Sequence, residues 1–268
     1  MKTQLLSILL FFLFISCEKK EDLSYLKDIE IIAHRGVTSQ VPENGLRAIS
    51  KTIDLRLDAV EFDVQMSKDS IPVVFHDDDL TTMTGKIGKV SDYTLQELKQ
   101  LRLRDKAGFI TSDSIPTLRE VLSFVEGRIH CFVDLKYSSL VMEKRVLELL
   151  EEYNMVDNVT ILSFDNKSLY RLFILNNQLS LCLLLYDEAS FPLNKDIDTY
   201  SHLVAFGVHR NLCRDGILIK LKADFPSFHI YAYTINSFND ITTKNLKRIT
   251  GLITDNPVEW LSLKAANP

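Results

Sequence analysis

The sequence lacks any tract of Lys and Arg along its 268 residues, and its formal net charge is −5. A nucleic-acid-binding face needs clustered positive charge to neutralise phosphates, so this charge pattern argues against a nucleic-acid partner. Internal repeats, low-complexity segments and interdomain linkers are missing as well. With 46% hydrophobic and 25% charged residues, the composition is that of an ordinary globular protein with room for one large domain or two small ones.

Cysteine is scarce too, with four residues in the chain. Cys17 belongs to the N-terminal segment, which leaves Cys131, Cys182 and Cys213. An odd number in an exported protein does not suggest a disulfide framework. Cys131 and Cys182 lie inside apolar runs, where cysteine usually behaves as a small buried hydrophobe. We therefore assign no chemical role to these three residues.

The apolar run near the N-terminus is too short to cross a bilayer as a helix, which needs roughly 20 residues. The run from Leu5 to Ile15 instead follows Lys2 and precedes Ser16-Cys17, which is typical of a signal peptide and resembles the lipobox of bacterial lipoproteins. We predict a signal peptide at 1–16, a tether at 17–27 and a lipid anchor at Cys17 that holds an exported lipoprotein on the periplasmic or cell-surface side of a membrane. A plain signal peptide cut nearby and an uncleaved anchor are the alternatives.

Short apolar runs alternate with amphipathic stretches from residue 29 onward, which predicts βαβ units and a parallel sheet. Helical spacing recurs between the apolar runs at Leu46–Leu55, Leu118–Val125, Val141–Leu150 and Leu169–Ile174. The predicted strands are Ile29–Ala33, Ala59–Val64, Pro72–Phe75, Ile129–Leu135, Val159–Leu162, Ser180–Leu185, Leu203–Val208, Ile230–Thr234 and Leu252–Thr254.

One connection is too short for a parallel crossover. Only the four residues Ser67–Ser70 separate the second and third runs, so these two strands should form a hairpin. The eight other strands predict a TIM (β/α)8 barrel, an α/β fold, with an extra hairpin strand and a small insertion after it at about 85–115. In such barrels the catalytic groups lie at the carboxyl ends of the strands.

Polar side chains occur where the first two predicted strands end. His34 and Arg35 combine a proton-transfer group with a planar fork of donors suited to phosphate oxygens; an ordinary surface loop is the alternative. Glu61 and Asp63 lie two residues apart, hence on one face of a strand, among apolar neighbours. Two buried carboxylates of like charge are costly unless a cation compensates them. Oxygen ligands favour Mg²⁺ or Ca²⁺ over zinc. A solvated strand end is the alternative.

Two further positions extend this polar group. A hairpin turn centred between residues 68 and 69 pairs position 61 with position 76, which places His76 beside Glu61. Asp134 and Lys136 repeat the two-residue spacing on a later strand. They offer a third metal ligand and a point charge for a phosphate oxygen, and a salt-bridged strand end is the alternative.

Together these segments resemble the glycerophosphodiester phosphodiesterase family over a predicted catalytic domain at 28–268. The combination of HRG, PEN, E-x-D and HD in this order is highly specific. The matching segments are Ala33–Gly36 (AHRG), Pro42–Asn44 (PEN), Glu61–Val64 (EFDV), Phe75–Asp77 (FHD), Ile115–Leu118 (IPTL), Asp134–Lys136 (DLK), Ser163–Asp165 (SFD), Tyr233–Asn236 (YTIN) and Gly251–Pro257 (GLITDNP).

The resemblance implies a TIM barrel that hydrolyses glycerophosphodiesters to glycerol 3-phosphate and an alcohol with a divalent cation. It implies that two histidines are the acid/base pair, without deciding which is the acid and which the base, and it assigns metal, substrate and supporting residues. These residues are His34 and His76 for catalysis, Glu61, Asp63 and Asp134 for the metal, Arg35, Lys136 and Tyr233 for the substrate, and Glu43 as support.

Three residues depart from the family pattern. Asp134 stands where the family has Glu, Gly45 where it has Thr, and Tyr233 where it often has Trp. One alternative is a same-fold enzyme for another diester, such as glycerophosphoinositol, a lysophospholipid or a wall polymer. A different class is a lipoprotein that only binds a phosphorylated ligand, and the presence of both histidines and both acids of the E-x-D pair argues against it.

Overall fold

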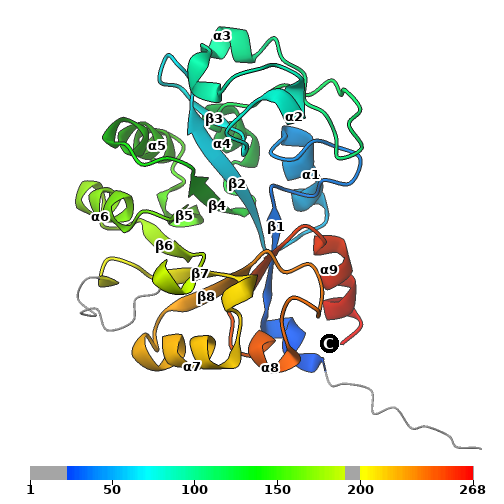
Figure 1. Ribbon diagram of the computed structural model, residues 1–268, viewed down its shortest axis with the longest axis vertical. Helices are drawn as coiled ribbons and strands as arrows, with labels where there is room; N and C mark the ends of the chain where they lie inside the picture. The colour runs from blue at the N-terminus through cyan, green and yellow to red at the C-terminus, as the bar shows by residue number, and fades with distance from the viewer. Residues whose placement is uncertain (1–22, 191–199, 268) are drawn as a thin grey trace, which may run out of the picture.

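The computed structural model describes residues 23–190 and 200–267, in which eight parallel strands close into a barrel (Figure 1). The ninth strand, β3, pairs antiparallel with β2 outside the barrel, as predicted. Hydrogen bonding between β1 and β2 completes the closure. The strands are β1 Glu30–His34, β2 Ala59–Met66, β3 Pro72–Val74, β4 His130–Leu135, β5 Val159–Ser163, β6 Ser180–Leu185, β7 Ala205–His209, β8 His229–Tyr233 and β9 Gly251–Thr254.

The helices surround the barrel, and several begin at the residues that favour a helix start. The Thr117 hydroxyl accepts from the backbone N–H of Glu120 at the start of α4, and Ser139 caps α5 in the same way. The helices are α1 Leu46–Asp54, α2 Thr81–Thr84, α3 Leu95–Leu98, α4 Leu118–Val125, α5 Leu140–Glu152, α6 Asn166–Leu175, α7 Asp215–Asp224, α8 Thr243–Leu246 and α9 Pro257–Ala265.

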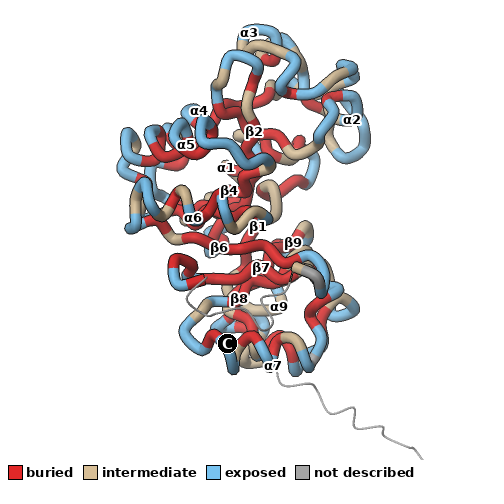
Figure 2. Tube along the Cα trace, turned by 60° about the vertical axis from the view of Figure 1, so that its left-hand side comes forward, coloured by how far each residue is buried: buried red, intermediate tan, exposed pale blue. Residues whose placement is uncertain are grey.

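Strand alternation divides the hydrophobic core into two layers. The outer layer lies between the barrel and its helices, whereas a smaller cluster fills the barrel interior. Figure 2 shows the strands buried at the centre of the molecule. Ile32, Ala59, Phe132 and Tyr231 belong to the inner cluster. Because side chains alternate with a period of two, the residues two positions further along these strands also face inward.

The segment between β3 and α4 builds a separate small core. It contains α2 and α3, and the insertion predicted at about 85–115 lies within it. Its buried cluster already begins on β3, which ties the segment firmly to the hairpin. The cluster consists of Val73, Phe75, Leu80, Val90, Leu98, Leu103 and Ile115.

The register of the hairpin differs by one residue from the prediction, which was wrong on this point. Val64 pairs with Val74, so the ladder is centred on residue 69 rather than between 68 and 69. The loop is one residue longer, because the Ser67 N–H donates to the Ile71 carbonyl and the Ser67 hydroxyl bonds Asp69. Since β3 ends at Val74, His76 lies beyond the ladder and is not paired with Glu61.

Within the described ranges no helix has the length and apolar character needed to cross a membrane. The predicted signal peptide and the lipidated Cys17 lie outside the described residues and stay predictions. Part of the predicted tether is folded, because residues 24–28 form a short 3-10 helix in which Leu26 is buried. Cys131, Cys182 and Cys213 are buried and free.

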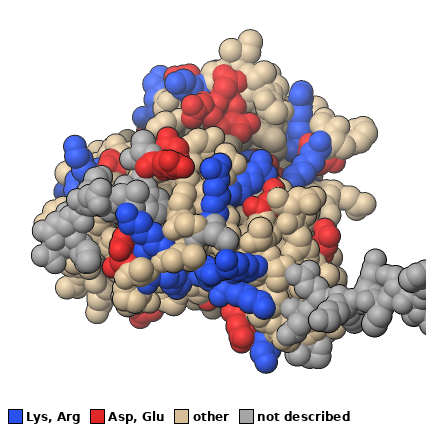
Figure 3. Space-filling view, turned by 60° about the horizontal axis from the view of Figure 1, so that its bottom comes forward, with Lys and Arg blue, Asp and Glu red and all other residues tan. Residues whose placement is uncertain are grey.

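Charged side chains of both signs are mixed on the surface. On the face in Figure 3, groups of Lys and Arg lie beside Asp and Glu. The Asp and Glu side chains therefore do not form one continuous acidic patch on this face.

Candidate active site

The carboxyl ends of the barrel strands bring almost all of the predicted site residues to one cavity of about 220 Å³. The inward positions of β1 and β2 place His34, Glu61 and Asp63 there, beyond Ile32 and Ala59 of the inner core. Glu43 contacts the group from the loop after β1. The predicted residues that line the cavity are His34, Arg35, Glu61, Asp63, His76, Asp134, Lys136 and Tyr233.

Three buried carboxylates lie together in this cavity. Glu61, Asp63 and Asp134 each offer an oxygen, and the three oxygens lie within 4.8 Å of one another. Asp63 and Asp134 are direct neighbours in the β2–β4 register. Asp134 Oδ1 is buried and has no hydrogen-bond partner among the described residues. Because a buried unpaired oxygen is costly, this arrangement fits a bound cation with oxygen ligands.

Burial and mutual repulsion perturb the ionisation of these carboxylates. Burial, followed by the charges of Asp63 and Asp134, raises the pKa of Glu61 well above its ordinary value. Burial and Asp63 likewise raise the pKa of Asp134 to about 6, against the opposing effect of Lys136. Burial also acts to raise the pKa of Asp63, but Lys136 and Arg35 outweigh it and lower the value. The positive charges nearby therefore do not fully compensate the three carboxylates of Glu61, Asp63 and Asp134, which we call the acidic trio.

Two cations flank the trio. Lys136 Nζ lies 3.4 Å from Asp63 Oδ1 and 3.3 Å from Asp134 Oδ2. Arg35 Nε lies 3.5 Å from Asp63 Oδ2, and its Nη1 donates to Glu43 Oε1 at 2.7 Å. Arg35 Nε is buried and, within the described chain, has no hydrogen-bond partner. Both cations can therefore still donate to phosphate oxygens that enter the cavity.

A sharp backbone turn after β1 presents Arg35 to the site. Arg35 has a φ of 57° and Gly36 a φ of 80°, in the left-handed region. A Cβ at Gly36 would also lie 2.8 Å from the backbone of Ala48 in α1. The turn allows the Arg35 N–H to donate to Glu61 Oε2 at 3.0 Å, which fixes one of the carboxylates.

Each histidine is held by a carboxylate through Nδ1. His34 Nδ1 lies 2.7 Å from Asp255 Oδ1, which leaves Nε2 on the side of Glu61, at 3.9 Å. His76 Nδ1 lies 2.8 Å from Asp77 Oδ1. A carboxylate at Nδ1 selects the tautomer with the proton on that nitrogen, so Nε2 remains free to accept a proton.

Sequence reasoning missed two residues that support the site. Asp255 follows β9 and accepts a hydrogen bond from Asn236 Nδ2 at 2.9 Å. Burial acts to raise the pKa of Asp255, but its hydrogen bond to His34 outweighs burial and the pKa is lowered. Asn44 Nδ2 donates to Asp63 Oδ2 at 2.8 Å. Both residues lie inside motifs quoted for the family resemblance, which was the only signal for them in the sequence.

The other half of the cavity is apolar. Leu162, Leu184 and Ile253 line it, together with aromatic rings that follow β5 and β6 or end β8. Tyr233 lies among them, where its hydroxyl donates to the carbonyl of Leu185 at 3.1 Å. The site therefore combines a charged half, which suits a phosphate and a metal, with an apolar half.

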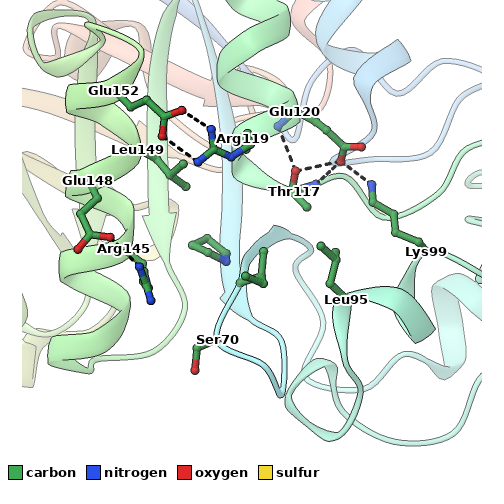
Figure 4. A pocket seen from close by; sticks show the side chains of 12 residues that line it. Ser70, Leu95, Lys99, Thr117, Arg119, Glu120, Arg145, Glu148, Leu149 and Glu152 are labelled. Atoms are coloured by element: carbon green, nitrogen blue, oxygen red, sulfur yellow. Dashed lines mark hydrogen bonds and ion pairs between the residues drawn. The ribbon is translucent and has the colours of Figure 1, made fainter.

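A second cavity, of about 510 Å³, lies beside the hairpin, α4 and α5 and is less suited to an anion (Figure 4). Its three cations are Lys99, Arg119 and Arg145, and each is paired with a glutamate. Because every cation is already neutralised, the charged groups are poorly placed to bind a phosphate. The cavity at the barrel mouth therefore remains the candidate active site.

We expect the metal-free protein to become more stable when the pH is lowered from 7.5 to 5. The folded pKa of Asp134 is about 6, above the unfolded value of about 3.9, so protonation stabilises the folded state and this stability is lost as the pH rises through about 6. Thermal unfolding after EDTA treatment measures the effect. Added Mg²⁺ or Ca²⁺ should raise the unfolding temperature more at pH 7.5 than at pH 5, and an equal rise at both values contradicts the prediction.

The chain is similar to known proteins over most of its length. The model of the glycerophosphoryl diester phosphodiesterase family matches residues 34–259. A glycerophosphodiester phosphodiesterase of Caldanaerobacter subterraneus subsp. tengcongensis is 29% identical over 242 residues, which cover 87% of this chain and 96% of the relative. The match spans nearly the whole of that relative.

Two solved structures share the fold. A phosphodiesterase of Oleispira antarctica, solved with the product sn-glycerol-3-phosphate, superposes with a TM-score of 0.76 at 23% identity, covering 90% of this chain and 98% of that one. A glycerophosphodiester phosphodiesterase of Thermotoga maritima superposes with a TM-score of 0.70 at 27% identity, covering 87% and 98%. The chain belongs to the glycerophosphoryl diester phosphodiesterase family and is an enzyme of the phosphodiesterase class.

Proposed function

We propose that the enzyme releases glycerol 3-phosphate and an alcohol from glycerophosphodiesters, with His34 and His76 as the acid/base pair and a divalent cation held by Glu61, Asp63 and Asp134. The observation that carries the proposal is the buried, unpartnered Asp134 Oδ1 within a trio of carboxylates at the barrel mouth. The oxygen-only donor set favours Mg²⁺ or Ca²⁺. Such a cation supplies Lewis-acid stabilisation of charge on the phosphate.

The charges of the chain itself prepare the site for a phosphodiester. The transition state of phosphoryl transfer spreads negative charge over the equatorial oxygens, and fixed donors aimed at them lower the barrier. Arg35 and Lys136 are such donors, because each is anchored on Asp63 and is about four-fifths buried. Arg35 Nε has no other partner within the described residues.

The two histidines move the protons. One accepts the proton of the attacking hydroxyl through its free Nε2, while the other donates a proton to the oxygen of the leaving alcohol as the P–O bond breaks. The attacking group can be the neighbouring hydroxyl of the substrate's glycerol. The cyclic phosphate so formed is then opened by water, with the two histidines in exchanged roles. Asp255 and Asp77 hold the rings in place for both steps.

A substrate panel tests the proposed function. Purified protein is stripped with EDTA and resupplied with Mg²⁺ or Ca²⁺, and release of glycerol 3-phosphate is measured from glycerophosphocholine, glycerophosphoethanolamine, glycerophosphoglycerol and glycerophosphoinositol. We expect release that depends on the added ion. No release from any diester with either ion would overturn the proposal, and retained binding of glycerol 3-phosphate in that case would favour a non-catalytic binding protein.

We expect Asp255→Asn to lower kcat by roughly 10–100-fold while KM changes little, since residues that orient a functional histidine typically contribute that much. An amide can present its NH₂ group to Nδ1, which favours the wrong tautomer of His34. Steady-state kinetics measure the split between kcat and KM. Asn236→Ala, which removes a donor to Asp255 and leaves the carboxylate in place, should cost less. A kcat within twofold of wild type for Asp255→Asn would contradict the positioning role.

A further inference from the structure

Four rings line the apolar half of the cavity and form a continuous aromatic wall. Phe164 follows β5, Tyr186 follows β6, His209 ends β7 and Tyr233 ends β8. Their centroids are 6.4 Å apart for Phe164 and Tyr233, 5.5 Å for Tyr233 and His209, and 4.6 Å for His209 and Tyr186. All four residues line the same cavity as the acidic trio.

The outer members of this wall are unusually exposed for aromatic side chains. Phe164 is 51% and Tyr186 is 56% exposed. Leu162, Leu184 and Ile253 lie in the same cavity and extend the apolar surface inward. Exposed aromatic rings that continue into a lined cavity mark a binding surface rather than a core.

The proposed mechanism decides which half of the substrate meets the wall. The phosphate needs Arg35 and Lys136, and the glycerol hydroxyl must reach the histidines and the acids, so both occupy the charged half. The alcohol on the other side of the phosphate is then left to the apolar half. This step depends on the proposed function.

Two hydrogen-bonding groups on the wall are already used within the protein. The Tyr233 hydroxyl donates to the Leu185 carbonyl, and His209 Nδ1 accepts from the Asn211 N–H at 3.4 Å. Beside these two groups a hydroxyl-rich alcohol would lose water without gaining equivalent partners. A group that presents methyl surface to aromatic rings loses little, and a positive charge on that group gains attraction from the ring faces.

The charges around the wall are compatible with a cation. Burial, together with Arg210, lowers the pKa of His209, which favours the neutral form of this ring. The Arg210 guanidinium lies 3.5 Å from Asp240 and is partly neutralised by it.

We propose that the aromatic wall of Phe164, Tyr186, His209 and Tyr233 binds the alcohol half of the diester and makes the enzyme prefer alcohols that carry a quaternary ammonium group, such as choline. Quaternary ammonium ions bind to aromatic faces in this way because they combine a diffuse positive charge with methyl surface.

A neutral isostere of choline tests whether the charge or the shape of the alcohol determines the preference. The 3,3-dimethylbutyl diester of glycerol phosphate has the outline of glycerophosphocholine with carbon in place of nitrogen. We expect kcat/KM for glycerophosphocholine to exceed that for the isostere by roughly tenfold, a ratio that attraction between a cation and two or more rings can supply. Glycerophosphoinositol should be a poorer substrate than either.

Wall variants identify the surface responsible. Tyr186→Leu and Phe164→Leu should each move the choline-to-isostere ratio toward one, whereas Tyr186→Phe keeps the ring and should keep the ratio. Tyr170→Leu is the matched control, because Tyr170 is an equally exposed aromatic residue, at 51%, on α6 outside the cavity. Thermal unfolding confirms that each variant is folded.

The outcomes keep this proposal distinct from the proposed function. Equal turnover of glycerophosphocholine and its isostere by the wild type, or preferred turnover of glycerophosphoinositol, overturns the quaternary ammonium assignment while the hydrolase stands. A ratio that survives both leucine variants shows that another surface selects the alcohol. Absence of glycerol 3-phosphate release from every diester instead contradicts the proposed function.

Discussion

We expect His34→Ala and His76→Ala each to reduce kcat for glycerophosphodiester hydrolysis by about 10²–10⁴-fold, the usual contribution of a general acid or base. Each imidazole is held through Nδ1 by a carboxylate, so the substitution removes a proton-transfer group whose orientation in the cavity is fixed. KM should change less, because Arg35 and Lys136 still bind the phosphate.

Initial rates of glycerol 3-phosphate release at saturating metal measure this effect. His229→Ala is a suitable control, since His229 begins β8 at the opposite end of the barrel from the site and is exposed. Both ring deletions leave the inner core intact because the two histidines lie at the rim of the cavity. Turnover by the double variant at the wild-type rate would exclude the histidines as the acid/base pair.

The barrel was predictable from the sequence because its strands are short, apolar and regularly separated by amphipathic helices. Period-two alternation also predicted the shared face of Glu61 and Asp63, since it depends on local geometry alone. The structure confirms the eight parallel strands and the hairpin. These features follow from rules that act over fewer than about ten residues.

The hairpin register could not be predicted from the loop length alone. Ser67 and Asp69 bond each other and close a loop one residue longer than assumed, and a shift of one residue moves every partner along the ladder. His76 nevertheless reaches the site, because it lies past the end of β3, where the chain no longer follows the ladder.

Contacts between residues far apart in the sequence could not be predicted either. Asp255 is 221 positions from His34, and only closure of the barrel between β9 and β1 brings them together. The aromatic wall has the same origin, because Phe164, Tyr186 and His209 come from three separate strand ends. Tyr233 alone was identified in advance, through the family resemblance rather than through its environment.

We expect Asp134→Asn to lower activity roughly 10²–10³-fold at a fixed, limiting concentration of Mg²⁺ or Ca²⁺, because Lewis-acid stabilisation is worth several kcal/mol and depends on the charge of the ligand set. The substitution preserves the volume of the side chain and an acceptor for Lys136, which lies 3.3 Å from Asp134 Oδ2. Asp134→Glu, which restores the residue type of the family pattern, should retain activity within about tenfold of wild type.

The stability of the same variant should change in the opposite direction. Burial raises the pKa of Asp134 to about 6, so at pH 7.5 the metal-free protein holds a carboxylate that its surroundings disfavour, and a neutral amide removes that cost. Metal-free Asp134→Asn should therefore unfold at a higher temperature than metal-free wild type, yet gain less on addition of metal. Simple damage to the fold would lower both stability and activity. A variant that binds and responds to metal as the wild type does would show instead that Asp134 is not a ligand, and that its unpartnered oxygen needs another explanation.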